Sequence, residues 1–421
     1  MKDYKNPRLV AYEAIYEVMF KEGYSNLILQ KSMNALSEKD KGLCTTITYG
    51  TIQNFDLLNY QLTQVHYDKL NNKQLCIIIM SLFQKHFLTK IPDYAIIQQA
   101  EKVTEQVIDR NAKRFVVALL KQLLELPLIY AKTDNADKDL AINYSHPLWM
   151  IKMLKKQYGE ETLLKILKSN NAIAKTHIRY NILSNKLDEV LKDPNVKKSE
   201  VVENGYYYLK GDLTKQEMYL KGYISIQDFS SQQVAIFADP KPDMKVLDMC
   251  AAPGTKTTHL AELMQDKGQI DAIDIYAHKI DLINEGAKRL DLKSIKTYLN
   301  DSTKLTETIP TESYDLILCD AVCTGLGVIK RKPEIKYQNI GQGMDEIMDV
   351  QRKLLEQAYQ LLKKGGTLVY STCTINKKEN ETMIAKFIEK HNDDLTLIAQ
   401  KQILGFEVDG DGFYMAKIIK K

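Results

Sequence analysis

The chain reads VLDMCAAPGTKTTHL from Val246 to Leu260, and this stretch decides the fold of the C-terminal half. A short apolar strand leads into a turn of small residues, and a helix follows. Small residues let the backbone of the turn approach a ligand, and the helix N-terminus offers free N–H groups. The spacing matches neither a Walker phosphate loop nor the GxGxxG pattern. The stretch therefore predicts a nucleoside-like ligand site without the pyrophosphate contacts of a nicotinamide site.

Strand and helix patterns alternate around this stretch. The strands are predicted at residues 245–249, 269–275, 295–299, 314–319 and 367–371, with helical patterns between most of them. Two further strands, 395–399 and 413–419, are separated by a Gly-Asp-Gly turn at 410–412 and indicate a closing hairpin. Alternation with short connections predicts an α/β, Rossmann-like domain, in which helices cover both faces of a mainly parallel sheet.

The N-terminal part of the chain has a different pattern. Residues 1–130 show helical apolar spacing and predict an all-α domain. A polar run at 132–139 marks a linker, assigned to 131–145. Residues 146–230 predict a small α+β segment with extended pieces near 176–181, 207–210 and 223–226. The α/β domain then occupies 231–421.

Length and composition agree with a soluble protein of two or three domains. The chain has 421 residues, 27% charged residues and a net charge of +4. Its six cysteines form no CxxC pair, which is typical of a reducing cytoplasm. There is no apolar stretch of about 18 residues and no apolar signal core at the start. We therefore expect a cytoplasmic protein without a membrane partner.

Two acidic residues complete the predicted ligand site. Asp274 ends the second strand, 20 residues after Gly254, and Asp301 follows the third strand. Open α/β sheets bind ligands at the carboxyl ends of their strands, and an acid there can accept hydrogen bonds from ribose hydroxyls. Each acid taken alone could be a solvated loop residue. A small-residue turn with two such acids suits a nucleoside without phosphates, which indicates S-adenosylmethionine as the cofactor.

Two cysteines follow the next two strands. Cys323 lies three residues after Asp320, at the end of the fourth strand, and Cys373 closes the fifth strand. These side chains should converge beside the cofactor. A thiolate that adds to carbon 6 of a pyrimidine makes carbon 5 nucleophilic enough to accept a methyl group. An acid near ring nitrogen 3 would stabilise the charge that develops there.

Two other interpretations of the cysteines remain open at this point. Buried cysteines are commonly small apolar core residues, and Cys44, Cys76 and Cys319 lie in apolar or helical runs that fit this role. Zinc bound by Cys323, Cys373 and His259 is a weaker alternative, because the sequence has no cluster with metal-ligand spacing. We therefore expect no metal.

Seven motifs carry a resemblance to a known family. They are QDFSSQ at 227–232, CAAPGTKT at 250–257, DAVCTGLG at 320–327, KRKPEI at 330–335, STCT at 371–374, ENE at 379–381 and DGFY at 411–414. With them the chain resembles the RNA cytosine-5 methyltransferases of the NOL/NOP2/Sun type, in particular the RsmB/Sun branch that modifies 16S ribosomal RNA. The helices with YGT at 49–51 resemble a NusB-type RNA-binding domain, and YSHPLW at 144–149 resembles the start of a ferredoxin-like segment.

The resemblance implies roles for the site residues. Cys373 matches the family nucleophile, and Cys323 matches the second cysteine, which releases the covalent adduct. Asp320 matches an acid that contacts either the methionine end of the cofactor or the target base. The other matched cofactor-binding positions are Cys250, Ala251, Ala252, Pro253, Gly254, Thr255, Lys256, Asp274 and Asp301. The chain departs from the family pattern at Val322, where proline is usual and would stiffen the loop.

The expected partner is 16S ribosomal RNA, bound by a monomer. The basic residues after the Cys323 loop are predicted to neutralise phosphates beside a flipped base; they are Lys330, Arg331, Lys332 and Lys336. A short basic run can also be a solvated face. Two alternatives remain open, namely the same reaction on transfer RNA and a non-catalytic, NusB-like RNA-binding or ribosome assembly factor.

Overall fold

The computed structural model divides into two compact units. The structure describes residues 3–21, 23–67, 69–338 and 340–421. The helical unit comprises Met1–Ala172 together with Ile329–Gln338, and the sheet unit comprises Ile173–Val328 and Asn339–Lys421. The chain therefore leaves the sheet unit shortly after Cys323, contributes ten residues to the helical unit and then returns.

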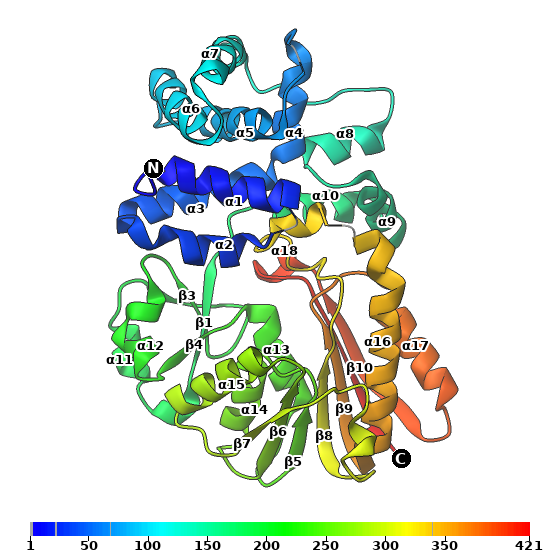
Figure 1. Cartoon of the computed structure of the whole chain (residues 1–421). Helices are drawn as coiled ribbons and strands as arrows, with labels where there is room; N and C mark the ends of the chain where they lie inside the picture. The colour runs from blue at the N-terminus through cyan, green and yellow to red at the C-terminus, as the bar shows by residue number, and fades with distance from the viewer. Residues whose placement is uncertain (1–2, 22, 68, 339) are drawn as a thin grey trace. The chain divides into compact units, whose positions relative to one another are not determined.

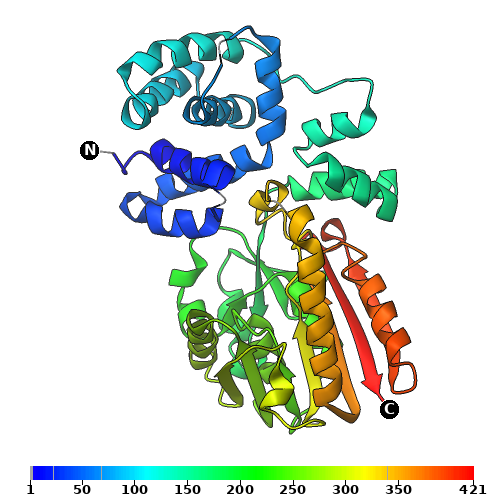
Figure 2. The same ribbon diagram turned by 45° about the vertical axis from the view of Figure 1, so that its right-hand side comes forward.

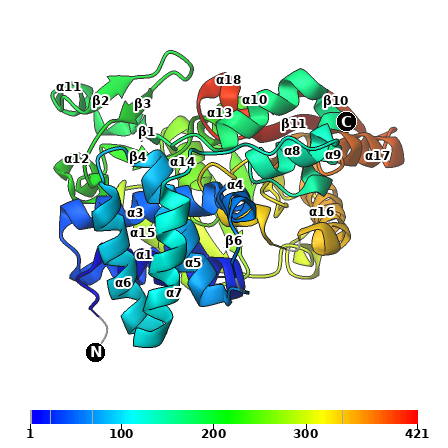
Figure 3. The same ribbon diagram turned by 90° about the horizontal axis from the view of Figure 1, so that it is seen from above.

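The helical unit contains ten α-helices among its described residues (Figures 1 and 3). The first seven are α1 (Pro7–Lys21), α2 (Ser25–Ser32), α3 (Glu38–Gln53), α4 (Phe55–Tyr60), α5 (Asn72–Phe87), α6 (Asp93–Val107) and α7 (Arg110–Leu124). The middle of helix α5, residues 76–84, is buried on every side, whereas α7 buries only one face. These patterns place α5 at the centre of the unit and confirm the predicted all-helical start of the chain.

The polar run predicted as a linker contains a helix. Helix α8 (Ala136–Asn143) begins after Asn135, whose side chain accepts a hydrogen bond from Lys138 N. Helices α9 (Leu148–Tyr158) and α10 (Glu160–Asn170) follow, and all three helices belong to the helical unit. The compact units therefore separate after Ala172, later than the predicted start of the α+β segment at residue 146.

Polar contacts hold the returning segment Ile329–Gln338 in the helical unit. The buried Glu334 carboxylate accepts hydrogen bonds from Ser25 N at 3.2 Å and from Ser25 Oγ at 3.0 Å. Tyr337 donates its hydroxyl to Ile52 O at 3.0 Å, and Gln53 Nε2 donates to Lys330 O at 3.3 Å. The segment is thus part of the packed interior of the helical unit.

The sheet unit begins with a small antiparallel sheet (Figure 1). Its strand order is β2-β3-β1-β4, formed by β1 (Thr176–Tyr180), β2 (Val196–Lys198), β3 (Gly205–Tyr208) and β4 (Ile224–Ile226). Two short helices, α11 (Leu187–Leu191) and α12 (Glu217–Leu220), connect the strands. The inward-facing residues of the sheet, such as Ile178, Tyr206 and Ile224, share one apolar cluster.

A seven-stranded sheet forms the rest of the unit, in the order β10-β11-β9-β8-β5-β6-β7. Its strands are β5 (Lys245–Asp248), β6 (Gln269–Asp274), β7 (Ile295–Leu299), β8 (Tyr314–Asp320), β9 (Leu362–Thr372), β10 (Leu395–Ile403) and β11 (Phe413–Lys420). Strands β5 to β9 pair in parallel, and β11 pairs antiparallel with both β9 and β10. The predicted Rossmann-like sheet and the closing hairpin are confirmed, with a short helix, α18 (Gly405–Val408), inside the hairpin connection.

Helices cover both faces of this sheet. Helices α16 (Ile340–Leu361) and α17 (Glu381–Lys390) lie side by side on one face (Figure 2). Helices α13 (Phe229–Ala238), α14 (Thr255–Leu263) and α15 (Ala277–Arg289) cover the other. Neighbouring strand residues point to opposite faces, so Leu368 and Tyr370 belong to one apolar cluster and Val369 to the other.

Candidate active site

Three strand ends meet at the centre of the large sheet. Strands β5, β8 and β9 are neighbours and run parallel, so their carboxyl ends lie at the same edge. They end at Asp248, Asp320 and Thr372. Strand order reverses direction around β5 and β8, and such a switch point is where open α/β sheets bind ligands. The sheet therefore brings the predicted site residues that end or follow these strands to one edge.

The two predicted cysteines lie side by side at this edge. Cys323 Sγ and Cys373 Sγ are 3.4 Å apart, close enough for one thiol to donate a hydrogen bond to the other sulfur. Both residues are only partly buried, in contrast with Cys44, Cys76 and Cys319. The hydrogen bond to Cys373, together with burial, raises the pKa of Cys323 well above its usual value. Cys323 is therefore a thiol at neutral pH, and its S–H can donate a hydrogen bond to the sulfur of Cys373.

Asp320 joins the cysteine pair to the turn after β5. Its Oδ2 is 2.8 Å from Lys256 Nζ, and its Oδ1 accepts a hydrogen bond from Ser371 Oγ at 2.7 Å. Burial opposes the charged form of Lys256, but the Asp320 carboxylate outweighs burial, and the pKa of Lys256 is raised. The ammonium also lies 4.8 Å from the centre of the Phe413 ring. The site thus holds a fixed positive charge beside the two thiols.

The buried carboxylate of Glu379 holds both cysteine loops; the residue belongs to the ENE motif, but it was not predicted as a site residue. Thr324 donates to it twice, from its backbone N at 2.9 Å and from its hydroxyl at 2.6 Å. Thr374 Oγ1 lies 3.4 Å from the same carboxylate. Gln351 Nε2 and Asn376 Nδ2 donate at 3.1 and 3.0 Å. Thr324 follows Cys323 and Thr374 follows Cys373, so one side chain sets the relation between the loops.

Glycine allows three loop backbones to touch beside the cysteines. Gly327 N donates to Cys373 O at 3.0 Å, and Gly412 N donates to Gly327 O at 2.7 Å. A Cβ atom on Gly327 would lie 2.0 Å from Gly412 O, which no side chain tolerates. The DAVCTGLG, STCT and DGFY motifs therefore meet through main-chain hydrogen bonds.

The turn after β5 is shaped as the sequence predicts. Gly254 has φ of +97°, a left-handed conformation that favours glycine, and its N–H donates to Ala251 O at 2.7 Å. A Cβ atom at Gly254 would lie 3.1 Å from Ile283 Cα, so the turn and α15 pack closely. Cys250, Ala252, Pro253 and Thr255 complete the turn, and α14 begins at Thr255.

Arg179 supports this turn from the small sheet, and sequence reasoning missed it. Its fully buried guanidinium donates to Glu262 Oε1 at 2.6 Å and Oε2 at 3.1 Å. Nη1 also donates to Thr255 O at 3.0 Å. A bidentate arginine–carboxylate pair has a rigid geometry. Arg179 thereby fixes the N-terminus of α14 against β1.

The two predicted acids occupy the ends of the neighbouring strands. Asp274 is the last residue of β6 and is 7% exposed, with Lys279 Nζ 3.6 Å from its Oδ1. Asp301 lies two residues after β7. Its Oδ1 accepts hydrogen bonds from Thr303 N and Oγ1, which lower the pKa of Asp301. Asp301 therefore shapes the loop that follows the carboxyl end of β7.

Asp248 is a further acid that was not predicted as a site residue. It ends β5, is 1% exposed and accepts a hydrogen bond from Thr257 Oγ1 at 2.7 Å. Burial raises its pKa to about 7. A buried carboxyl at the switch point is typical of ligand sites, and the only sequence signal was its place directly before the turn.

The predicted RNA-contacting residues need correction. Lys336 is 1% exposed, and its Nζ donates to Gln53 O at 2.7 Å and Asn171 Oδ1 at 3.2 Å. Burial lowers the pKa of Lys336 to about 7. Lys330 is also buried, whereas Arg331 is partly exposed and Lys332 exposed. Lys330 and Lys336 are interior residues of the helical unit. A phosphate contact requires an exposed side chain, so the prediction for these two lysines is wrong.

Neither a metal cluster nor a membrane helix occurs in the part of the chain that the structure describes. There, no group of three or more histidine, cysteine, aspartate or glutamate side chains could hold a metal ion. No described helix is both long and apolar enough to cross a membrane.

Three family models match consecutive parts of the chain. Residues 235–419 match "16S rRNA methyltransferase RsmB/F", residues 5–125 match the NusB family, and residues 146–206 match the ferredoxin-like domain of RsmF/B-like methyltransferases. The three predicted kinds of domain are confirmed in their predicted order. The model of the NusB family covers most of the helical unit.

Relatives and solved structures agree with these matches. The chain is 36% identical to the probable ribosomal RNA small subunit methyltransferase B of Bacillus subtilis, over 98% of both chains. The crystal structure of PH0851 has a TM-score of 0.82 at 25% identity, over 98% of this chain and 99% of that one. NSun6 from Pyrococcus horikoshii with SFG, an analogue of S-adenosylmethionine, has a TM-score of 0.59 at 23% identity, over 64% and 97%.

Proposed function

The chain belongs to the ribosomal RNA small subunit methyltransferase B family, and we propose that it methylates carbon 5 of a cytosine in 16S ribosomal RNA through a covalent bond to Cys373. The observation that carries this proposal is the pair of thiols 3.4 Å apart at the carboxyl ends of β8 and β9. Two thiols so placed provide one nucleophile and one group that acts when the nucleophile leaves.

The protein is a methyltransferase dependent on S-adenosylmethionine, and its residues fit this cofactor. When bound, the cofactor supplies an electrophilic methyl group. The left-handed conformation of Gly254 lets the chain turn sharply between β5 and α14, at the edge where open α/β sheets bind ligands, and Ile283 of α15 fills the space of a Cβ atom there. Asp274 and Asp301 present carboxylates, which accept hydrogen bonds from hydroxyl and amino groups and repel phosphates. This chemistry suits a nucleoside without a phosphate tail.

In the first step, the Cys373 thiolate forms a bond to carbon 6 of the cytosine ring. The electrons of the C5–C6 double bond move toward carbon 5 and nitrogen 3, and carbon 5 becomes nucleophilic. The Lys256 ammonium, held by Asp320, provides positive charge near the site where negative charge develops. The thiol of Cys323 can donate a hydrogen bond to the Cys373 thiolate before the attack.

In the last step, the methylated ring releases the enzyme. Carbon 5 then carries both a methyl group and a hydrogen. The hydrogen leaves as a proton, its electron pair forms the C5–C6 double bond again, and the C6–sulfur bond breaks with its electrons returning to Cys373. A water molecule beside Cys323 accepts the proton, and the Cys323 thiol donates a hydrogen bond to the departing sulfur of Cys373. Thr324 and Glu379 keep the loop of Cys323 in position although Val322 replaces the usual proline.

The assignment of 16S ribosomal RNA as substrate rests on the relatives and on the helical unit. The names of the matching relatives specify the RNA of the small ribosomal subunit. The NusB-family match covers residues 5–125 and adds an RNA-binding module to the methyltransferase domain. Transfer RNA is the competing substrate, because the catalytic chemistry is the same for both RNAs.

The direct test supplies the purified protein with S-adenosylmethionine labelled in its methyl group. Protein-free 16S ribosomal RNA and bulk transfer RNA serve as parallel substrates, and nucleoside analysis identifies the modified base. We expect labelled 5-methylcytosine in the ribosomal RNA alone. Label only in transfer RNA, or in another nucleoside, would refute the proposed substrate or the proposed position of methylation.

A further inference from the structure

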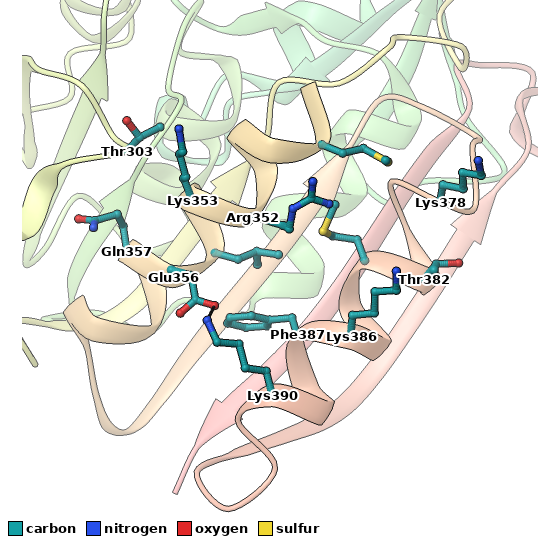
Figure 4. Close-up of a pocket in the computed structure, with 13 residues that line it drawn as sticks. Thr303, Arg352, Lys353, Glu356, Gln357, Lys378, Thr382, Lys386, Phe387 and Lys390 are labelled. Atoms are coloured by element: carbon teal, nitrogen blue, oxygen red, sulfur yellow. Dashed lines mark hydrogen bonds and ion pairs between the residues drawn. The ribbon is translucent and has the colours of Figure 1, made fainter. Parts of the chain in front are cut away.

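A cavity of about 560 Å³ lies between α16 and α17, on the face of the sheet that these helices cover. Figure 4 shows Arg352, Lys353 and Glu356 on its α16 side and Lys378 and Lys386 on its α17 side. Its apolar lining comes from the residues Met348, Leu355, Met383 and Phe387. We call this cavity the α16–α17 basic pocket.

The charge of the basic pocket is one-sided. Five cationic residues line it, against one carboxylate; the cations are Arg352, Lys353, Lys378, Lys386 and Lys390. The carboxylate of Glu356 already has partners, Lys390 Nζ at 2.6 Å and His391 Nε2 at 3.1 Å. Arg352 pairs with Asp349. Lys353, Lys378 and Lys386 are exposed and have no carboxylate within ion-pair distance among the described residues. The pocket therefore offers three lysines to an anion.

Two residues connect the basic pocket with the cysteine loops. Gln351, directly before Arg352 on α16, donates to Val322 O at 2.9 Å, next to Cys323. Glu379, directly after Lys378, accepts hydrogen bonds from Thr324. The backbone segments that carry pocket cations thus also hold the loop of Cys323. An anion bound in the pocket lies beside the elements that position the thiols.

We propose that the α16–α17 basic pocket binds phosphates of the RNA strand that carries the target cytosine. The inference rests on the proposed function, because the occupant is the substrate itself. Lysines act as point charges toward phosphate oxygens, and several on one surface follow the backbone of a strand without reading its sequence. The pocket provides the exposed cations that Lys330 and Lys336, buried in the helical unit, do not.

The volume and the lining favour an RNA strand over a small free anion. A space of about 560 Å³ exceeds what a lone phosphate needs and is in the range of ligand pockets. The three lysines are spread over two elements, Lys353 on α16 and Lys378 with Lys386 on and before α17. Charges distributed in this way match successive phosphates along a backbone.

The test removes two of these lysines and measures how RNA binding depends on salt. The variant Lys378→Gln/Lys386→Gln is compared with Lys267→Gln/Lys293→Gln, in which two exposed lysines before β6 and β7, at the opposite edge of the sheet, lose the same charge. The probe is protein-free 16S ribosomal RNA, with salt varied at fixed pH. All four side chains are exposed, so both variants should keep the wild-type Tm and the wild-type affinity for S-adenosylmethionine.

We expect the slope of log Kd against log salt to fall by about 1.4 in the pocket variant, since each lost phosphate contact on a single strand removes about 0.7. The KM for RNA should rise several-fold while kcat stays near the wild-type value. The control variant should leave both unchanged. Equal slopes and equal KM values in the two variants would overturn the inference. The same result is expected if the pocket binds an acidic protein and not RNA, so that alternative would also count against the proposal. Failure of the proposed function is separate, because the wild-type protein would then methylate no ribosomal RNA.

Discussion

Replacing Glu379 with glutamine tests whether one buried carboxylate sets the geometry of the two cysteine loops. Glu379 is 0% exposed and accepts hydrogen bonds on both oxygens. Thr324 N and Gln351 Nε2 donate to Oε2. Thr324 Oγ1 and Asn376 Nδ2 donate to Oε1. The substitution Glu379→Gln keeps the shape and turns one acceptor oxygen into an amide donor.

The structure determines the cost of this change. If the amide nitrogen took the Oε2 position, it would face two donors, Thr324 N and Gln351 Nε2. If it takes the Oε1 position, the hydroxyls of Thr324 and Thr374 can rotate and accept, and only Asn376 Nδ2 then faces a donor. The second orientation is therefore preferred and leaves one buried donor unsatisfied. That loss costs about 1–3 kcal/mol, a large part of the roughly 5–15 kcal/mol that stabilises a typical domain.

The assay combines thermal unfolding with steady-state kinetics. We expect Glu379→Gln to lower Tm by about 2–4 °C for each kcal/mol lost. It should also lower kcat, because the loops of both cysteines depend on the carboxylate. The double variant Glu379→Gln/Asn376→Asp restores an acceptor opposite the new amide and should recover part of both losses. The control is Glu389→Gln, which removes the same charge from an exposed position on α17.

Two results would refute this reasoning. A Glu379→Gln protein with the Tm and kcat of the Glu389→Gln control would show that the buried carboxylate is dispensable. A double variant no better than the single one would show that the lost hydrogen bond to Asn376 is not the cause.

Three further predictions concern burial and packing. Burial raises the pKa of Asp248 to about 7. The stability that its protonated form provides is therefore fully present below about pH 4 and is lost as pH rises through 7. Tm should fall over this pH range, and Asp248→Asn should make that fall smaller. A Cβ atom at Gly50 would lie 2.0 Å from Phe83 Cζ, so Gly50→Ala should destabilise the helical unit by about 1–3 kcal/mol. Gly42 lies in the same helix with open space around its Cβ position, so Gly42→Ala should stabilise the unit by roughly 0.5–1 kcal/mol. Chemical denaturation measures both changes. Lys336→Met should leave the salt slope of RNA binding unchanged, where a phosphate contact would reduce its magnitude by about 0.7.

The strands of the large sheet could be predicted because turns or helices bound them, and because the central strands β5, β6 and β8 are largely buried and short. Strand β7 has the predicted limits of 295–299. Strand β9 instead begins at Leu362, five residues before the predicted start. Its first residues include two lysines and two glycines, which argue against a strand. Pairing of Leu362 with Tyr314 on β8 overrides this local preference.

In the small sheet, too, local sequence pattern fails to predict a strand that pairing with its neighbour creates. Extended pieces were predicted near three of its strands, but β2 at Val196–Lys198 was not. The sequence VKK has no apolar alternation, and β2 is an edge strand that pairs only with β3. Tertiary pairing, rather than local pattern, makes it a strand.

The site residues divide according to how far apart their partners lie in the sequence. Cys323, Cys373 and Gly254 could be predicted because each follows its own strand. The burial of Lys336 could not, since its partners Gln53 and Asn171 lie 283 and 165 residues away. A basic run within a polar segment gives no sign of such partners, and it is typical of a solvated surface.

The most direct test of the covalent mechanism identifies the atom to which the RNA becomes attached. The Cys323→Ala protein is incubated with S-adenosylmethionine and protein-free 16S ribosomal RNA, the product is separated on a denaturing gel, and mass spectrometry locates the nucleotide after digestion. We predict a slow-migrating adduct whose nucleotide is bonded to Cys373, and no adduct with the double variant Cys323→Ala/Cys373→Ala. A nucleotide on any other residue, or full methyl transfer by Cys373→Ala alone, would contradict the account.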